Sequence, residues 1–209
     1  MLLVTLFDSA NVSDDSLESA LQMLWEHPQV LAELCELLDV LRERINHVQT
    51  PLACRPDAPL QVHARYTRRE IQAALGKGLG LRLPLWQAGV LWMPAERVDV
   101  FVFTLDKSGG RFSPTTRYRD YAISPEVIHW ESQSTTREES DTGQRYQNHN
   151  QQGSEVLLFA RVSPDDRAFW CLGSARYQAH EGERPMAIQW KLDIPLSGDL
   201  FALFAAAVA

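Results

Sequence analysis

The sequence of 209 residues has few cysteines and no long hydrophobic run, and both shortages exclude classes of protein. The three cysteines, Cys35, Cys54 and Cys171, are odd in number and widely spaced. This pattern favours a reducing compartment such as the cytoplasm over a disulfide-bonded secreted domain. The longest strongly apolar stretch, residues 200–209, is half as long as a membrane-spanning helix requires. No Lys or Arg precedes the apolar residues 1–7, so we expect neither a secretory signal nor a membrane partner.

Motifs for catalysis and for cofactors are equally scarce. No Gly-x-Ser-x-Gly elbow indicates a serine hydrolase. The glycines within residues 76–80 follow a predicted helix rather than a strand, which is typical of a helix end and not of a phosphate-binding loop. His129, His149 and His180 lie far apart and have no cysteine at the spacing of metal ligands. We therefore expect no catalytic residue, no metal and no cofactor.

Positive charge is also in deficit, with 20 Lys and Arg against 27 Asp and Glu, but its distribution is uneven. Residues 1–60 contain ten acidic and three basic residues, and residues 125–209 contain twelve and seven. Residues 61–124 reverse the balance, with five acidic and ten basic residues. The basic residues of this stretch are Arg65, Arg68, Arg69, Lys77, Arg82, Arg97, Lys107, Arg111, Arg117 and Arg119. The net charge of −7 therefore does not exclude a nucleic acid, because a phosphate backbone responds to local charge.

Residues 1–60 predict a helical arm and a linker. Asp14 and Asp15 can cap a first helix, Pro28 interrupts it, and leucines at intervals of three and four then continue the pattern. Three prolines between residues 51 and 59 indicate the linker. We expect the apolar stripe of the arm to pack on the rest of the chain or on a neighbouring domain.

Residues 61–209 predict a mainly β domain of the α+β class. Thr67 and Glu70 form a capping box that begins a short helix, and Gly76 ends it. Apolar runs typical of strands lie at residues 98–103, 156–162, 168–172 and 186–194. Strands of this length with few helices indicate a mixed curved sheet or a partly closed barrel.

The polar section between Asp106 and Gly153 has few strand signals, and long loops in compact domains are often functional. Aromatic residues alternate in it with Arg, Ser, Gln and Asn, a mixture suited to stacking a base and reading its polar edge. The candidate base-binding residues are Tyr118, Asp120, Tyr121, His129, Trp130, Ser132 and Gln133. The candidate contacts to the DNA backbone are Arg111, Arg117, Arg119 and Arg145. The alternative is structural, because such loops also fold back on a sheet and Asp120 could pair with a neighbouring arginine.

Several ordered motifs together carry a family resemblance. They read "YTRREIQAALG", "GVLWMPAERVDVFVFTLDK", "FSPTTRYRDYAISPEVIHWESQSTT", "TGQRYQNH", "GSEVLLFAR" and "HEGERPMAIQWKL". Residues 64–195 thereby resemble the C-terminal domain of SauUSI-type type IV restriction proteins, in which a phospholipase-D-type nuclease and a superfamily 2 helicase precede that domain. The resemblance implies an SRA-like domain of the PUA-related kind, which recognises modified cytosine in DNA. It also implies that the helical arm joins this domain to the helicase.

The function that we expect is non-catalytic recognition of a modified base in double-stranded DNA by base flipping. The resemblance makes 5-methylcytosine or a related base the expected ligand, and the chain the targeting domain of a modification-dependent restriction helicase. Two alternatives stay open. Asp165, Gln189 and Lys191 loosely fit the magnesium-binding pattern of some restriction nucleases. The chain could instead be a protein-interaction module that regulates the helicase.

Overall fold

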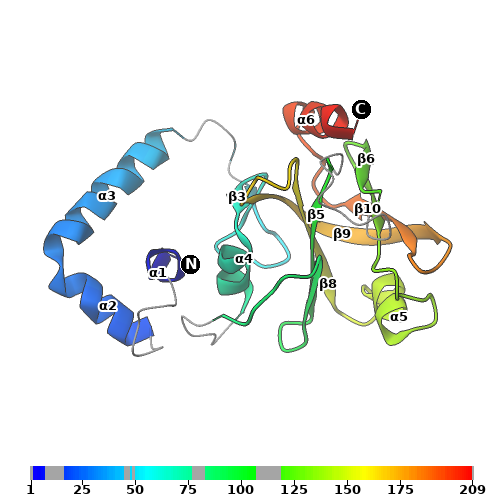
Figure 1. Ribbon diagram of the computed structural model, residues 1–209, viewed down its shortest axis with the longest axis horizontal. Coiled ribbons are helices and arrows are strands. Elements are labelled where there is room, and N and C mark those ends of the chain that lie inside the picture. Colours follow the sequence, from blue (N-terminus) through cyan, green and yellow to red (C-terminus); the bar gives the residue numbers. More distant parts are fainter. Residues whose placement is uncertain are drawn as a thin grey trace.

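A computed structural model describes residues 2–7, 17–44, 48, 50–76, 83–106 and 119–208. Its helices are α1 (Leu2–Leu6), α2 (Leu17–Glu26), α3 (Pro28–Glu43), α4 (Arg68–Leu75), α5 (Asp141–Asn148) and α6 (Gly198–Val208). Its strands are β1 (Thr50–Pro51), β2 (Gln61–Val62), β3 (Arg65–Tyr66), β4 (Val90–Met93), β5 (Val98–Thr104), β6 (Tyr121–Ser124), β7 (Val127–Glu131), β8 (Glu155–Arg161), β9 (Phe169–Glu181) and β10 (Ala187–Leu192). The strands gather on one side of the molecule, and α2 and α3 form an arm on the other, with α1 between the arm and α4 (Figure 1).

The domain is built on one large mixed sheet with the strand order β4-β5-β8-β9-β10-β7-β6, and β3 also pairs with β9. Strands β5 and β8 run parallel, with Val98 opposite Glu155, whereas the other pairs are antiparallel. Within the described residues no pairing joins the edge strands β4 and β6, so the sheet does not close into a barrel. The predicted α+β class and the mixed sheet are confirmed.

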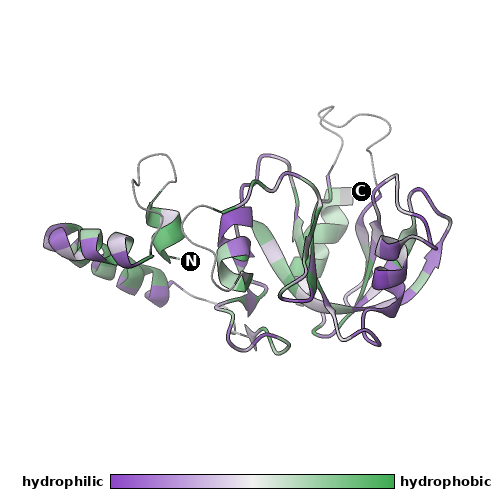
Figure 2. Ribbon diagram, turned by 90° about the horizontal axis from the view of Figure 1, so that it is seen from below, coloured by the Kyte–Doolittle hydropathy of each residue, from purple (hydrophilic) through white to green (hydrophobic). Residues whose placement is uncertain are grey.

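The central strand β5 shows why the core has two halves. Its apolar residues alternate as predicted, yet every residue from Val98 to Thr104 is buried. Val98 and its neighbours on one face pack in a cluster with Ile71 of α4, whereas Phe101 on the other face packs with Tyr146 of α5 and with residues of α6. A strand that is covered on both faces has no solvent-exposed face, so its side chains are buried on both sides. The central strands are accordingly hydrophobic in Figure 2, while hydrophobic and hydrophilic residues alternate along the arm.

The polar section contains more regular structure than its sequence indicates. Strands β6 and β7 form a hairpin, and α5 follows it. The side-chain oxygen of Ser140 accepts a hydrogen bond from the backbone N–H of Gly143, at 3.2 Å, and caps α5. Strand β9 likewise continues to Glu181, well beyond the predicted run, because its polar second half pairs with β10. Pairing with β10 therefore defines the second half of β9, whereas β7 has an alternating pattern, with Ile128 and Trp130 buried, within a mostly polar section.

The arm has the predicted pair of helices, separated at Pro28. Helix α2 contacts the rest of the chain through Ala20, which is buried with Val4 of α1 and has Ala73 of α4 packed beside it. In contrast, α3 buries no residue, and Leu38 and Leu41 of its apolar stripe are exposed. A neighbouring domain as the partner of that stripe stays a prediction. The folded domain itself includes residues before 61, because β1 pairs with β2 and Leu52 belongs to the core. None of the described helices has the length and apolar character needed to cross a membrane.

His149 is a buried residue that can keep its hydrogen bonds only while it is neutral. The backbone N–H of Tyr177 donates to Nε2 at 3.2 Å, so this nitrogen carries no proton. Nδ1 therefore carries it and faces the carbonyl oxygen of Ser154 at 3.3 Å. Burial lowers the pKa of His149 below its ordinary value. Protonation would thus break the bond to Tyr177 in a site that disfavours charge.

We expect His149 to make the fold less stable in mild acid. Because the folded pKa is depressed, the unfolded chain takes up the proton first, at a pKa of about 6.5. The contribution is complete above that pH and is lost as the pH falls through the folded pKa. Urea unfolding at pH 8 and pH 5 should show a larger loss for the wild type than for His149→Gln. Equal losses in the two proteins would contradict this assignment.

Candidate functional site

The hairpin β6–β7 carries several of the predicted base-binding residues on its two faces. Tyr121 and His129 are paired in register, and their rings stack with centroids 4.6 Å apart. The Nδ1 atom of His129 lies 2.7 Å from the backbone oxygen of Arg119. Trp130 follows His129 in the strand and therefore points to the opposite face. The structure thus joins Tyr121 to His129 but does not join either to Trp130. Tyr118, Arg111 and Arg117 lie outside the described residues.

Trp130 lies at the edge of the core. Its side chain is 3% exposed, and its ring stacks on Phe101 with centroids 4.2 Å apart and an angle of 8° between the planes. Tyr146 packs edge-on against both rings. Trp130 therefore already has a stacking partner, and the part of it that meets a cavity forms a wall. Its role in base binding stays a prediction.

Asp120 and Ser132 organise the backbone around Trp130. Asp120 is 3% exposed, and its Oδ1 accepts a hydrogen bond from the N–H of Glu131 at 3.0 Å. The Oγ of Ser132 accepts from the N–H of Met186 at 2.8 Å and donates to the carbonyl of Gln133 at 3.2 Å. Ser132 is thus buried in a structural position, whereas the Asp120 carboxylate and the exposed Gln133 side chain reach a cavity.

This inner cavity has a volume of about 370 Å³ and lies against the sheet. Its polar lining comprises Arg68, Gln87, Thr104, Asp120, Glu131, Gln133 and Arg161. Its apolar lining comprises Val90, Val102, Phe103, Trp130 and Phe169, together with Gly89. Small-molecule sites in proteins have volumes of about 300–1,000 Å³ and combine apolar walls with a few polar groups. The cavity therefore has the size and the lining of a binding site for a small planar group.

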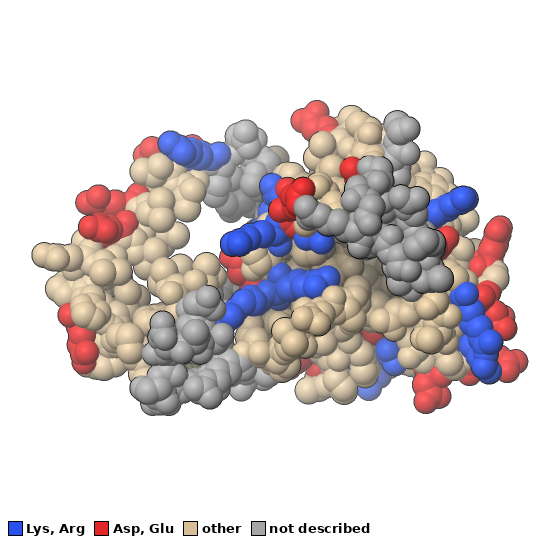
Figure 3. Space-filling view, in the orientation of Figure 1, with Lys and Arg blue, Asp and Glu red and all other residues tan. Residues whose placement is uncertain are grey.

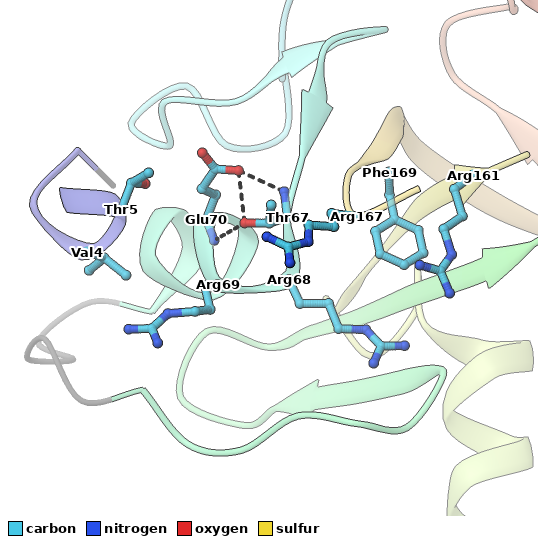
Figure 4. A pocket seen from close by; sticks show the side chains of 9 residues that line it. All are labelled: Val4, Thr5, Thr67, Arg68, Arg69, Glu70, Arg161, Arg167 and Phe169. Atoms are coloured by element: carbon cyan, nitrogen blue, oxygen red, sulfur yellow. Dashed lines mark hydrogen bonds between the residues drawn. The ribbon is translucent and has the colours of Figure 1, made fainter. Parts of the chain in front are cut away.

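A second hollow, the outer groove, adjoins the inner cavity. It has a volume of about 580 Å³ and shares Arg68, Arg161 and Phe169 with the inner cavity (Figure 4). Its other lining residues are Val4, Thr5, Thr67, Arg69, Glu70 and Arg167. Basic side chains gather on the same face of the molecule, between the arm and the sheet, whereas the arm shows acidic ones (Figure 3). The outer groove is therefore a basic approach to the inner cavity.

The capping box of α4 places two of the groove's arginines. The Oε2 of Glu70 accepts from the N–H of Thr67 at 2.7 Å, and Oγ1 of Thr67 lies 3.3 Å from the N–H of Glu70 (Figure 4). This reciprocal pair fixes the first turn of the helix, from which Arg68 and Arg69 project. The Oε2 atom of the Glu70 carboxylate is thus engaged in the cap.

Arg68 and Arg161 stand beside the ring of Phe169. Their guanidinium carbons lie 5.7 Å and 4.8 Å from the centroid of that ring. Arg68 donates to the carbonyl of Gln87 at 3.0 Å, and Arg161 donates to Oγ1 of Thr104 at 2.9 Å and to the carbonyl of Asp166. Burial lowers the pKa of both arginines, and repulsion by Arg161 lowers that of Arg68 further. Two cations are thus held close together in a partly dry site.

The remaining predicted backbone contacts differ from these. Arg145 forms two hydrogen bonds to the carboxylate of Asp99, at 2.7 Å and 3.0 Å, and its guanidinium lies 4.3 Å from the ring of Trp92. It is engaged inside the domain and does not line the inner cavity or the outer groove. Arg119 is exposed, and its backbone N–H donates to Glu131 at 3.0 Å. Contact of either side chain with DNA stays a prediction.

Sequence reasoning missed Arg161, Arg167 and Phe169, which form the far wall of the outer groove. Arg161 ends β8, Arg167 lies in the connection that follows, and Phe169 begins β9, in a part of the chain whose average charge is acidic. A signal was present, because arginines next to the ends of two apolar strands lie where neighbouring strands meet. Composition averaged over a long segment concealed it.

The alternative nuclease residues are not brought together. Lys191 pairs with Arg176, which lies seven residues along β9 from Phe169, a separation of roughly 20 Å in a strand. Asp165 lies before Phe169, on the far side of it from Arg176. Within the part of the chain that the structure describes, no three His, Cys, Asp or Glu residues are arranged to hold a metal ion.

Together, the fold and the site define a class of protein: an α+β domain with an open mixed sheet and an arginine-lined cavity against it. Residues 60–204 match the family described as a domain of unknown function, DUF3427, and the chain belongs to that family. The match includes α4, the strands from β2 to β10 and both arginines shared by the two hollows. No curated protein matches the chain.

Proposed function

We propose that the chain binds a modified base that has been flipped out of duplex DNA, and that it does so without catalysis. In this proposal the inner cavity receives the base, with 5-methylcytosine or a related cytosine as the ligand. The domain acts as an SRA-like, PUA-related module in the cytoplasm and directs the helicase and nuclease of a restriction protein to modified DNA. The resemblance of residues 64–195 to SauUSI-type restriction proteins supports this assignment.

The lining of the inner cavity is the observation that carries the proposal. Carboxylates are the groups that accept a hydrogen bond from the amino group of cytosine, and Asp120 is a carboxylate held in place by the N–H of Glu131. The side-chain amide of Gln133 makes no hydrogen bond with the described residues, so it can both donate and accept. Phe103 and Trp130 add apolar walls. This combination suits a flat ring with a polar edge.

The energies are compatible with a binding module. Flipping a base costs a few kcal/mol, and this cost is smallest for a mismatched or damaged base. Stacking returns about 1–3 kcal/mol per base, and the hydrogen bonds to Asp120 and Gln133 would add to that. A single methyl group buries little area and contributes about 1 kcal/mol. We therefore expect moderate discrimination between modified and unmodified cytosine.

Asp120→Asn tests the cavity without removing its framework. The amide oxygen of asparagine can still accept from the N–H of Glu131, but the negative acceptor for the base is lost. We expect affinity for the preferred modified duplex to fall roughly tenfold or more, since a hydrogen bond to a charged group contributes about 1.5–3 kcal/mol. Anisotropy titrations should use duplexes with cytosine, 5-methylcytosine, 5-hydroxymethylcytosine or phosphorothioate. Glu126→Gln, the same change at an exposed position of the hairpin, is the matched control.

Three results would count against the proposal. Equal affinity of the wild type for all four duplexes would exclude recognition of a modification. Absence of DNA binding would favour the protein-interaction module. Mg²⁺-dependent cleavage that disappears in Lys191→Ala would favour the nuclease. Trp130→Ala is a weaker probe, because the loss of a buried Trp stacked on Phe101 would destabilise the whole core.

A further inference from the structure

We infer that the outer groove is a phosphodiester-binding site, in which Arg68 and Arg161 hold the DNA backbone next to the flipped base. The inference rests on the proposed function, because it assigns the inner cavity to the base. It adds the ligand of the groove and the residues that contact it. The sequence placed the backbone contacts on other arginines.

The shared wall of the two hollows is the first argument. Arg68, Arg161 and Phe169 line both the inner cavity and the outer groove. The phosphate of a nucleotide is joined to its base through the sugar, so a base in the inner cavity leaves its phosphate at the entrance. Side chains that line both spaces are placed at that entrance. Figure 4 shows the Arg68 and Arg161 side chains projecting beside Phe169 from two different elements.

The charge at this wall is the second argument. Arg68 donates to the carbonyls of Trp86 and Gln87, and Arg161 donates to a hydroxyl and a carbonyl. Neither forms an ion pair with the described residues, and the buried Nε of Arg68 has no hydrogen-bond partner among them. Burial and repulsion by Arg161 lower the pKa of Arg68, whereas the carboxylates of Asp165 and Asp166 offset part of the charge of Arg161. A phosphate between them would neutralise the repulsion and could accept paired hydrogen bonds from each fork.

The size and extended basic lining of the outer groove favour a DNA strand over a free phosphate ion as its ligand. Arg69 and Arg167 extend the basic lining beyond the shared wall, and the volume of about 580 Å³ exceeds what one phosphate fills. Arg167 is exposed and makes no hydrogen bond or ion pair with the described residues. The N-terminus of α4 does not supply the site, since the capping box occupies it. The arginine side chains are therefore the groups that would bind the anion.

A neutral phosphate substitution tests the contact directly. One methylphosphonate is placed in turn at each phosphate that flanks the modified base in the best-binding duplex of the anisotropy series. For the wild type, we expect one position at which the substitution weakens binding about tenfold, because it removes a charged partner of the arginines. In Arg68→Gln and Arg161→Gln the affinity for unmodified backbone should fall by a similar factor, and the methylphosphonate should then have no further effect.

Two further variants, at exposed arginines, distinguish the loss of a phosphate contact from damage to the fold. Arg167→Gln changes an exposed side chain without such bonds, and we expect it to reduce the slope of log affinity against log salt by about 0.9. Arg176→Gln removes the same charge from a residue that is 65% exposed and lies well along β9 from the groove. The affinity of Arg176→Gln and its response to the methylphosphonate should match those of the wild type.

The outcomes separate this inference from the proposed function. A retained preference for modified DNA, with no flanking methylphosphonate that weakens binding, overturns the phosphate site alone. Loss of the preference, with salt slopes still reduced by the groove variants, overturns the base pocket and supports a general backbone site. Binding of inorganic phosphate but not of DNA, or no binding of either, overturns both.

Discussion

Replacing Arg145 with alanine is expected to lower the free energy of unfolding by about 3–5 kcal/mol. The change leaves the carboxylate of Asp99, which is 0% exposed near the start of β5, without its partner. Burial already raises the pKa of Asp99 above its ordinary value, even with the guanidinium in place. The contact of Arg145 with the ring of Trp92 is lost as well. Urea unfolding at neutral pH measures the effect.

Two comparisons distinguish this explanation from a general loss of surface charge. Arg176→Ala removes an exposed arginine that pairs with Asp193 at 2.8 Å, and it should cost at most about 1 kcal/mol. Combining Arg145→Met with Asp99→Val should recover most of the stability, since the unpaired buried charge is gone. If Arg145→Ala and Arg176→Ala were equally mild, Asp99 would have another source of stabilisation.

The Asp99–Arg145 pair also limits what mutagenesis can say about DNA binding. Arg145 is predicted from the sequence to contact the DNA backbone, because it lies in the polar section beside Tyr146. Its partner is 46 residues earlier in the chain, where local composition cannot reveal it. Weaker DNA binding by Arg145→Ala would therefore reflect unfolding unless the affinity is measured per folded molecule.

Helix α4 and several central strands could be predicted from the sequence, because local capping and apolar patterns define them. The capping box and Gly76 delimit α4, and the apolar runs correspond to β5, β8 and β10. Strands β6 and β7 are short and lie within a mostly polar section, and α5 has few apolar residues. Their stability comes from the pairing of β7 with β10 and from buried side chains such as Ile128, Trp130 and Tyr146. A sequence pattern cannot show contacts that only the assembled sheet creates.

The same reason explains the partial prediction of the site. Asp120, Trp130 and Gln133 follow one another closely in the chain, and the aromatic and polar mixture indicated them. Arg161 and Phe169 reach the same cavity only because β8 and β9 lie between β5 and the hairpin strands in the sheet order. The order of the strands in the sheet therefore brings the two sides of the site together.

Charge shows the effect of assembly most directly. The outer groove takes Arg68 and Arg69 from the basic stretch of the sequence, but Arg161 and Arg167 from a segment that is acidic on average. Many of the acidic residues that determine the net charge lie on the arm, away from the groove (Figure 3). A negative protein can therefore present a positive groove, and salt dependence is the property that would reveal it.

Replacing Gly143 with alanine is expected to destabilise the domain by about 3 kcal/mol. A methyl group at this position of α5 would lie 2.0 Å from the carbonyl oxygen of Arg137 and 2.8 Å from that of Glu138. Both clashes involve backbone atoms, and the side chains of Gln144 and Gln147 bind the Glu138 carbonyl to the helix. The segment before α5 must therefore move away. Urea unfolding provides the measurement.

Gly198→Ala is the matched control, because it is also a helical glycine replaced by alanine. No atom lies within 4 Å of the added methyl group at the start of α6, so we expect stability to be unchanged or to rise by up to about 1 kcal/mol. The helix preference of alanine acts in both variants, and only Gly143→Ala adds the clash. If the two variants were equally stable, the close approach of residues 137–138 to α5 would be wrong. If Gly143→Ala remains folded but is destabilised, the base preference should weaken too, because the Thr136 N–H donates to the carbonyl of Gln133 at the inner cavity.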